Sequence, residues 1–329
     1  MPLLRDRPDD LDALVAATAS SLRLDVGFVE KDFWVLEVLR AATAPIHATA
    51  KDGSQHPVRT IFKGGTSLSR AYGLIERFSE DVDLLLSFPQ VDIGVGARDK
   101  VLKAIRDAVA HHLATTGVQG AVTIGVKRYI RYPYPARHGS PEVTEGVLLE
   151  MGSRGGAFPT REHDLRSMIA NHAVDTLGEA DDAWDEFESV SVAVLAPERT
   201  LLEKLALLHD AASRYPDDNA RAKLLRGGRH LYDVHKLLSS DDVVAMLSAL
   251  GPAGVADLSR DIDEHSENAD FSFTTRPEAG YQASPLLDPN SPCRDALRHG
   301  YATAMTLVYG EQPTLEDCLQ SIRASGPLL

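Results

Sequence analysis

The chain has 329 residues, of which 43% are hydrophobic and 25% charged, enough for a sizeable core in one large or two ordinary globular domains. A net charge of −14 argues against nonspecific wrapping of duplex nucleic acid, which depends on Lys and Arg, but allows a local basic patch that holds one RNA end. No apolar run approaches a membrane span, no secretory pattern opens the chain, and two distant cysteines form no disulfide framework, so we expect a cytoplasmic protein without a membrane partner.

The N-terminal region is predicted to contain two helices, over 9–24 and 27–44. Apolar residues in the second recur at roughly helical spacing, which indicates an amphipathic helix that packs on the core. We therefore prefer a structural part for this helix to a direct catalytic part for Glu30 or Lys31.

The stretch 61–86, IFKGGTSLSRAYGLIERFSEDVDLLL, is the most informative in the chain. Its Gly64-Gly65 pair predicts a turn that approaches a ligand closely, because glycine tolerates positive φ. A helix is predicted over 68–77, preceded by Thr66 and Ser67 as N-cap residue types. The N–H groups and the positive dipole end of such a helix suit a triphosphate.

Two carboxylates follow this turn. The run from Asp81 to Leu86 is predicted to be a strand, in which Asp81 and Asp83 share one face because side chains alternate. Such a pair repels itself unless a cation is bound, and Asp oxygens are ligands that Mg²⁺ prefers. A glycine turn alone is commonly a plain loop, and a pair of aspartates alone is commonly a solvated strand end. Both features in one short unit favour a phosphate cradle facing a metal platform. Nearby, Lys63 and Arg70 could each reach a phosphate.

Two further segments complete the N-terminal half. A helix over 97–115 precedes a strand over 121–134, whose basic and tyrosine residues fit either RNA binding with base stacking or a solvated β-ribbon. The residues concerned are Lys127, Arg128, Tyr129, Arg131, Tyr132 and Tyr134. A strand over 146–152 carries Glu150, which either is a third carboxylate of the site or faces water at the strand end.

Helical patterns dominate after about residue 169, with 190–194 as the remaining predicted strand. The next helix carries Lys204 within its apolar stripe. A lysine there either extends along the apolar surface to water or directs its charge into a site. From the residues alone, Asp233 is interpreted as forming a surface pair with Arg229.

Three motifs resemble those of the AbiEii/AbiGii family of nucleotidyltransferase toxins, within the polymerase-β-like nucleotidyltransferase superfamily. KGGTSLSRAYGLIERFSEDVDL is similar to its signature of a glycine turn and a hydrophobic-flanked Asp-x-Asp. LAPERTLLEKLALL is similar to its third motif, whose lysine lines the active site and is Lys204 here. The segment from Arg229 to Asp233 is similar to its fourth motif, Arg-x-x-x-Asp-Leu, with Val234 in place of the leucine.

The resemblance implies an α/β protein: a polymerase-β-like nucleotidyltransferase core with a mixed sheet, plus a mainly helical C-terminal lobe. The catalytic lobe would comprise 1–168. The helical lobe, 169–329, would contribute Lys204 and Asp233 to the site.

The resemblance also implies roles for the candidate residues. Asp81 and Asp83 would hold Mg²⁺ against an NTP, with Glu150 as a third ligand or a base. Lys204 would neutralise charge on the triphosphate, and Asp233 would orient Lys204 or the acceptor. The phosphates would be cradled by Gly64, Gly65, Thr66 and Ser67.

As a function, the family implies a toxin of a toxin–antitoxin pair. Such a protein would transfer NMP from an NTP to an RNA acceptor such as the tRNA 3′ end, would block translation, and would have a cognate antitoxin protein. The motifs do not specify the acceptor, so transfer to a protein or a small molecule such as an antibiotic is an alternative. A non-catalytic binding partner is another, although the intact motif residues argue against it. No zinc, Ser-His-Asp or GxxxxGK[ST] pattern occurs.

One further residue is a candidate for control. If the strand already begins at Ser79, its hydroxyl shares a face with Asp81 and Asp83. A phosphate there would bring up to about two negative charges to the metal platform and switch the enzyme off. The interpretation we prefer is an ordinary turn serine.

Overall fold

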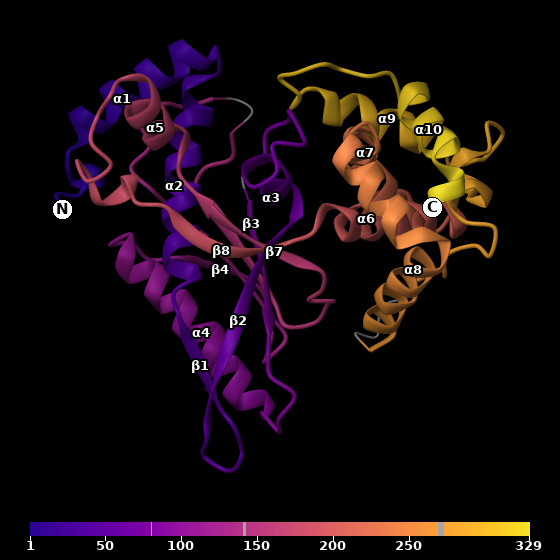
Figure 1. The fold of residues 1–329 in the computed structure, drawn as a ribbon, viewed down its shortest axis with the longest axis horizontal. Coiled ribbons are helices and arrows are strands. Elements are labelled where there is room, and N and C mark those ends of the chain that lie inside the picture. Colours follow the sequence, from indigo (N-terminus) through magenta and orange to yellow (C-terminus); the bar gives the residue numbers. More distant parts are fainter. Residues whose placement is uncertain (80, 141–142, 269–272) are drawn as a thin grey trace. The chain divides into compact units, whose positions relative to one another are not determined.

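The computed structural model describes residues 1–79, 81–140, 143–268 and 273–329 (Figure 1). The chain divides into two compact units. Unit 1 consists of Met1–Ala71, Ser79–Ser153 and Thr160–Val194, and unit 2 of Tyr72–Phe78, Arg154–Pro159 and Leu195–Leu329. The boundary expected after residue 168 falls within unit 1, because residues 190–194 lie in a strand of its sheet.

A mixed sheet forms the centre of unit 1. Its described strands follow the order β4-β5-β6-β3-β2-β8-β7, with β1 paired to β2. The pairs β3–β6 and β2–β8 are parallel, whereas β2–β3 and β5–β6 are antiparallel, which confirms the predicted α/β class with a mixed sheet. The strands are β1 (Ile46–Thr49), β2 (Gln55–Lys63), β3 (Asp81–Ser87), β4 (Val118–Thr123), β5 (Lys127–Tyr132), β6 (Val147–Gly152), β7 (Thr160–Leu165) and β8 (Val190–Leu195).

The described helices separate by unit. Unit 1 contains α1 (Pro8–Leu22), α2 (Val26–Ala42), α3 (Gly64–Arg70), α4 (Val95–His112) and α5 (Met168–Asn171). Unit 2 contains α6 (Pro197–Ser213), α7 (Asp218–Leu238), α8 (Asp241–Asn268), α9 (Arg294–Met305) and α10 (Leu315–Ala324). The predicted helical character of the C-terminal part is therefore confirmed.

Helix α2 is buried on every side along most of its length, not on one face as the sequence pattern predicts. Two of its buried charged residues are hydrogen-bonded internally: Glu30 accepts from the backbone N–H of Arg137 at 2.8 Å, and Lys31 donates to the backbone oxygen of Thr144 at 2.6 Å. These bonds offset the desolvation of the two charged side chains. The structural interpretation of Glu30 and Lys31 holds, although the helix is not amphipathic.

The helix predicted over 68–77 is wrong at both ends, since α3 begins at Gly64 and ends at Arg70. Residues 72–78 instead pair with the segment after α9: the Phe78 N–H donates to the Leu307 oxygen at 2.8 Å, and Arg77 and Val308 form a β-bridge. Tertiary pairing within unit 2 thus overrides the local helical pattern.

The strand predicted over 121–134 is a hairpin of β4 and β5, because the chain turns at Gly125, which has φ of +68°. Alternation along β5 divides the predicted basic and aromatic cluster between the two faces of the sheet. Arg128 is buried and pairs with Asp99 at 2.9 Å, and Tyr132 is fully buried. On the other face, partly buried, lie Lys127, Tyr129 and Arg131.

Unit 2 is organised around α7. A Cβ on Gly228 of α7 would overlap the backbone of Gly300 in α9, so the missing side chains permit close contact between these helices. By length and composition α8 is the described helix that qualifies as a candidate membrane span. However, Gly251 (φ 64°, ψ 174°) and Pro252 interrupt it, so neither part has the roughly 20 continuous helical residues of a span.

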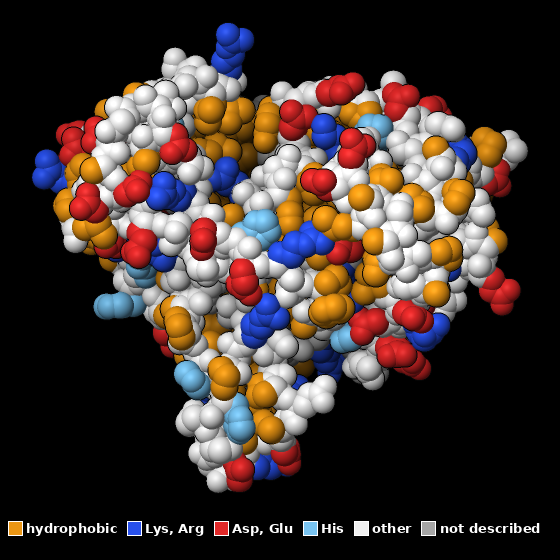
Figure 2. Space-filling view, viewed as in Figure 1, with side chains coloured by type: hydrophobic (Ala, Val, Ile, Leu, Met, Phe, Trp, Pro, Cys, Tyr) orange, Lys and Arg blue, Asp and Glu red, His pale blue; other side chains and the backbone are white. Residues whose placement is uncertain are grey.

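Acidic and basic side chains are interspersed on the face shown in Figure 2. The described residues on that face form no continuous basic field, in keeping with the net charge of −14.

Candidate active site

Three carboxylates meet on neighbouring strands of unit 1. Along β3, Asp81 and Asp83 are partly buried and Val82 is fully buried, which is the alternation that the sequence predicts. The parallel register of β3 and β6 pairs Asp83 with Glu150. Glu150, proposed from the sequence as a third carboxylate on another strand, is therefore the cross-strand partner of Asp83.

The electrostatics of Glu150 follow from this register. Burial, and then the charges of Asp83 and Asp81, raise the pKa of Glu150 from 4.5 to about 7. Burial, followed by the charges of Glu150 and Asp83, likewise raises the pKa of Tyr129 to about 12. Tyr129 lies opposite Glu150 in the antiparallel register of β5 and β6. The cluster thus disfavours full ionisation unless a cation offsets the repulsion.

Gly64 has φ of +81°, as the sequence argument for a glycine turn requires. A Cβ built on Gly64 would overlap Oδ2 of Asp83. The close approach at this turn is therefore made by a carboxylate of the site itself. Lys63, the residue before the turn, lies opposite Asp83 in the register of β2 and β3 and also immediately precedes α3.

The hydroxyl groups of Thr66 and Ser67 are buried and bonded within the protein. Thr66 Oγ1 donates to the backbone oxygen of Asp81 at 2.6 Å and lies 2.9 Å from Ser79 Oγ. Ser67 Oγ donates to the backbone oxygen of Gly64 at 2.9 Å. Neither side chain caps α3, contrary to the sequence prediction, because that helix starts before them. Both hydroxyls fix the turn and the start of β3.

The guanidinium of Arg70, a predicted phosphate ligand, is engaged inside unit 1. It pairs with Asp32 of α2 at 2.8 Å and donates to the backbone oxygen of Arg166 at 2.7 Å. Burial raises the pKa of Asp32, whereas the charge of Arg70 and a hydrogen bond from the Met168 N–H oppose that rise. Arg70 therefore ties α3 to α2 and to the segment that precedes α5.

A second charged cluster lies in unit 2. Asp233, fully buried on α7, accepts from Arg77 through both carboxylate oxygens, at 2.6 and 2.7 Å, and pairs with Lys204 of α6 at 2.8 Å. The side chain of Lys204 is only 7% exposed, so it does not extend to water. The surface pair with Arg229 expected from the residues alone is likewise wrong, because the carboxylate of Asp233 is buried between two other cations.

The charges of this cluster are mutually dependent. Burial opposes the ionisation of Asp233, but the charges of Arg77 and Lys204 hold its pKa well below the usual range. Burial lowers the pKa of Lys204, and the charge of Asp233 opposes that change. His230 Nδ1 lies 3.3 Å from Lys204 Nζ, and burial together with Lys204 lowers the pKa of His230 well below its ordinary value.

Sequence reasoning missed Arg77, because its partner Asp233 is 156 positions away in the chain. No local pattern distinguishes this arginine from the neighbouring charged residues. The structure brings Asp81, Asp83, Glu150, Lys63 and Gly64 together in unit 1 and, separately, Lys204 and Asp233 in unit 2.

The carboxylate set fits a magnesium ion better than a zinc ion. Over the residues that the structure describes, no group of three or more His, Cys, Asp and Glu side chains forms a complete metal site. Mg²⁺ is commonly bound through one or two carboxylates, with water and substrate phosphates as the remaining ligands. Asp81 and Asp83, whose repulsion with Glu150 a cation would offset, meet that requirement.

Comparison with known proteins gives one family. The model of the family described as "Nucleotidyl transferase AbiEii toxin, Type IV TA system" matches residues 52–319. Among solved structures, the chain is similar to MenT4, a nucleotidyltransferase toxin from Mycobacterium tuberculosis H37Rv, at 16% identity and a TM-score of 0.46, over 95% of this chain and 94% of that one. No curated protein matches.

The raised pKa of Glu150 predicts a pH-dependent stability. Folding raises this pKa from 4.5 to about 7, so the resulting stabilisation is complete below pH 4.5 and is lost as the pH rises through 7. Asp83→Asn removes the carboxylate whose charge raises the pKa of Glu150 more than that of Asp81 does. In urea unfolding with EDTA, this variant should lose less stability than wild type between pH 5 and pH 8, and it should have no transferase activity. Asp257→Asn, at an exposed position, should retain the wild-type pH dependence. An active Asp83→Asn protein would remove the metal platform from the mechanism.

Gly64→Ala should abolish transfer through a displacement of Asp83. The matched control is Gly53→Ala, because Gly53 has a similar φ of +88° but no atom within 4 Å of an added Cβ. Each variant should lose about 1–2 kcal/mol of unfolding free energy from left-handed strain. Only Gly64→Ala should lose activity, as measured by nucleotide transfer at a temperature where both variants are folded. Equal activity of the two would mean that the position of Asp83 is not critical.

Ser79 lies ahead of β3 and not in the strand, so the shared face on which its predicted control depends is absent. Its Oγ still reaches Thr66, which holds the backbone of Asp81. Ser79→Glu should therefore slow transfer, and Ser79→Ala should retain most of it, in single-turnover assays. A Ser79→Glu rate equal to wild type would show that charge at this position does not reach the site. An inactive Ser79→Ala would show that the hydroxyl itself is needed.

Proposed function

We propose a reaction for this chain on the basis of its family. The chain belongs to the AbiEii nucleotidyltransferase toxins of type IV toxin–antitoxin systems. The proposed reaction is Mg²⁺-dependent transfer of NMP from an NTP to an RNA acceptor such as the tRNA 3′ end, which would block translation in the cytoplasm. The observation that carries the proposal is the register that pairs Asp83 with Glu150, with Asp81 on the same strand face.

Asp81 and Asp83 would hold the metal ion and, through it, the triphosphate. A bound Mg²⁺ would polarise the phosphoryl oxygens and lower the pKa of the attacking hydroxyl. The two carboxylates are held for this task by β3, by the hydrogen bond from Thr66 to the Asp81 backbone, and by the space that Gly64 leaves. The phosphate cradle would then use backbone N–H groups from Gly64 to Ser67, since the hydroxyls there are engaged elsewhere.

Glu150 would act as the general base. The hydroxyl oxygen of the acceptor forms a bond to the α-phosphorus, the bond from that phosphorus to the bridging oxygen breaks, and pyrophosphate leaves. The proton of the hydroxyl passes to Glu150, which is the cross-strand partner of Asp83 and so lies beside the proposed metal ligands. The pKa of about 7 belongs to the cluster without a cation; a bound Mg²⁺ would lower it, so that Glu150 is ionised and able to accept the proton.

The choice of RNA as acceptor is supported by the side chains on β5. Tyr129 is the cross-strand neighbour of Glu150, and the Lys127 ammonium lies 5.6 Å from the centroid of the Tyr129 ring. Arg131 follows on the same face of that strand. Single-stranded nucleic acids are bound by such combinations of an aromatic ring and nearby cations.

The direct test is incubation with each labelled NTP and Mg²⁺ in the presence of total tRNA, protein or antibiotics. We expect label on tRNA, and none on tRNA whose 3′ diol has been oxidised with periodate. Asp83→Asn is the matched inactive control. Label on protein or on an antibiotic would overturn the RNA acceptor while retaining the transferase. No label on any acceptor would favour a non-catalytic protein. Recovery of growth on co-expression of the cognate antitoxin would test the toxin role.

Lys204 is proposed to neutralise charge on the triphosphate, with Asp233 as its positioning residue. An ammonium has three donors, and Asp233 and His230 account for two of them. Lys204→Ala should reduce turnover by about 100-fold or more. Its stability loss should be smaller than that of Arg77→Ala, because Asp233 keeps both hydrogen bonds from Arg77.

Measurement of turnover and melting temperature on the same preparations separates the two effects. Lys223→Ala is the control, because it removes a partly exposed lysine from the neighbouring helix α7. If Lys204→Ala lost stability but kept its turnover, the lysine would be a packing residue only.

A further inference from the structure

The strand β1 leaves one edge open. Among the described strands it pairs with β2 alone, in a register that sets His47 opposite Pro57. Proline has no N–H, so a position without ladder hydrogen bonds suits it. The Ala50 N–H donates to Ser54 on the β2 side of the hairpin, at 2.9 Å. Since backbone groups alternate in direction, the N–H and C=O groups of His47 and Thr49 point away from β2.

The next residue on that outer edge confirms the alternation. The Lys51 N–H donates to the backbone oxygen of Asp92 at 3.0 Å, so another segment already pairs with the edge at one position. Over the described parts of the chain, no further backbone group pairs with the outer edge at His47 or Thr49. The edge therefore offers a short row of donors and acceptors that continues from an existing bond.

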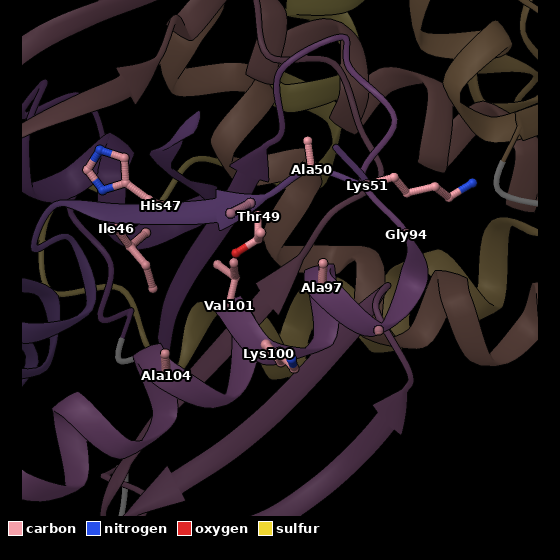
Figure 3. A pocket seen from close by; sticks show the side chains of 12 residues that line it. Ile46, His47, Thr49, Ala50, Lys51, Gly94, Ala97, Lys100, Val101 and Ala104 are labelled. Atoms are coloured by element: carbon pink, nitrogen blue, oxygen red, sulfur yellow. The ribbon is translucent and has the colours of Figure 1, made fainter. Parts of the chain in front are cut away.

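A groove of about 520 Å³ runs between this edge and helix α4 (Figure 3). Lys51 and Gly94 lie at one end of the groove, and Ile46 and Ala104 lie at the other. The volume is within the range of about 300–1,000 Å³ found for ligand sites. A groove bounded by a strand edge on one side and a helix on the other is the shape that accepts an extended peptide as an added strand.

The charge of the groove selects the kind of peptide. Its charged lining residues are Lys51 and Lys100, no Asp or Glu lines it, and the whole chain carries a net charge of −14. Helix α4 also begins there, with Gly94 as N-cap residue and no acidic side chain in its first turn. Its positive dipole end adds to the lysines. Lys51 pairs with Asp92 at 2.8 Å, but both side chains are about two-thirds exposed, so the pair is weak.

We propose that this groove binds an extended acidic segment of a partner protein, which adds as a strand to the outer edge of β1. Backbone hydrogen bonds to His47 and Thr49 provide the pairing. The acidic residues of the segment lie beside Lys51, Lys100 and the start of α4. This binding is independent of the transferase reaction and is tested without it.

The probe is a fluorescein-labelled peptide of alternating valine and threonine that ends in two glutamates. Fluorescence anisotropy should show binding to the wild-type chain, with no binding of the matched peptide that ends in two lysines. A peptide whose alternate backbone amides are N-methylated should not bind either, because it cannot pair as a strand. These two peptides test charge and pairing on the unmodified protein.

Two variants test the groove itself. Lys100→Glu and Thr49→Pro should each weaken binding by roughly tenfold or more, since the first reverses a charge and the second removes an edge N–H. Proline is tolerated on strand edges, and melting temperatures verify the fold. Arg260→Glu is the control, because it makes the same charge change at a 65% exposed position on α8.

Four results would overturn the proposal: no binding at millimolar peptide, equal binding of the lysine peptide, equal binding of the N-methylated peptide, or unchanged binding to Thr49→Pro. Light scattering adds a fifth. A dimer that Thr49→Pro dissociates, without any peptide binding, would mean that the edge pairs with a second copy of this chain.

Discussion

Repulsion among Asp81, Asp83 and Glu150 is the constraint on which the rest of unit 1 depends. Parallel pairing of β3 with β6 fixes Asp83 and Glu150 as neighbours, and the buried residues of both strands prevent them from moving apart. Without a bound cation, burial and then the charges of Asp83 and Asp81 raise the pKa of Glu150 to about 7, and a proton on Glu150 reduces the repulsion. Cation binding and proton release at this cluster are therefore linked.

The cluster in unit 2 joins two buried cations to one buried carboxylate. Arg77 and Lys204 share the single carboxylate of Asp233, and His230 stays neutral beside them because its pKa is lowered. The planar fork of Arg77 occupies both carboxylate oxygens, so Asp233 is fixed before Lys204 contributes anything.

What the sequence predicts well is what short-range geometry determines. Alternation places Asp81 and Asp83 on one strand face, and glycine at position 64 predicts positive φ, as found. The pairing of Asp83 with Glu150 depends on strand register, which single-sequence patterns do not specify. Arg128 and Tyr129 point to opposite faces because side chains alternate along β5, whereas the hairpin turn at Gly125 is a feature that the strand pattern concealed.

Contacts between residues far apart in the chain are the ones that the sequence did not predict. Lys204 has two interpretations from its helical stripe, and only the buried carboxylate of Asp233 excludes the one in which its ammonium reaches water. The helix expected after Thr66 stops early because residues 72–78 pair with the segment near Val308. Neither partner is signalled by sequence spacing, since each lies far along the chain.

The hydroxyl of Thr66 explains why the central stretch alone is recognisable from its residues. It joins the glycine turn to the backbone of Asp81 across 15 positions, so residues of the stretch itself hold the turn against the start of the strand. The further proposed site residues, Glu150 and Lys204, lie in distant segments, where the residues alone leave two interpretations open for each.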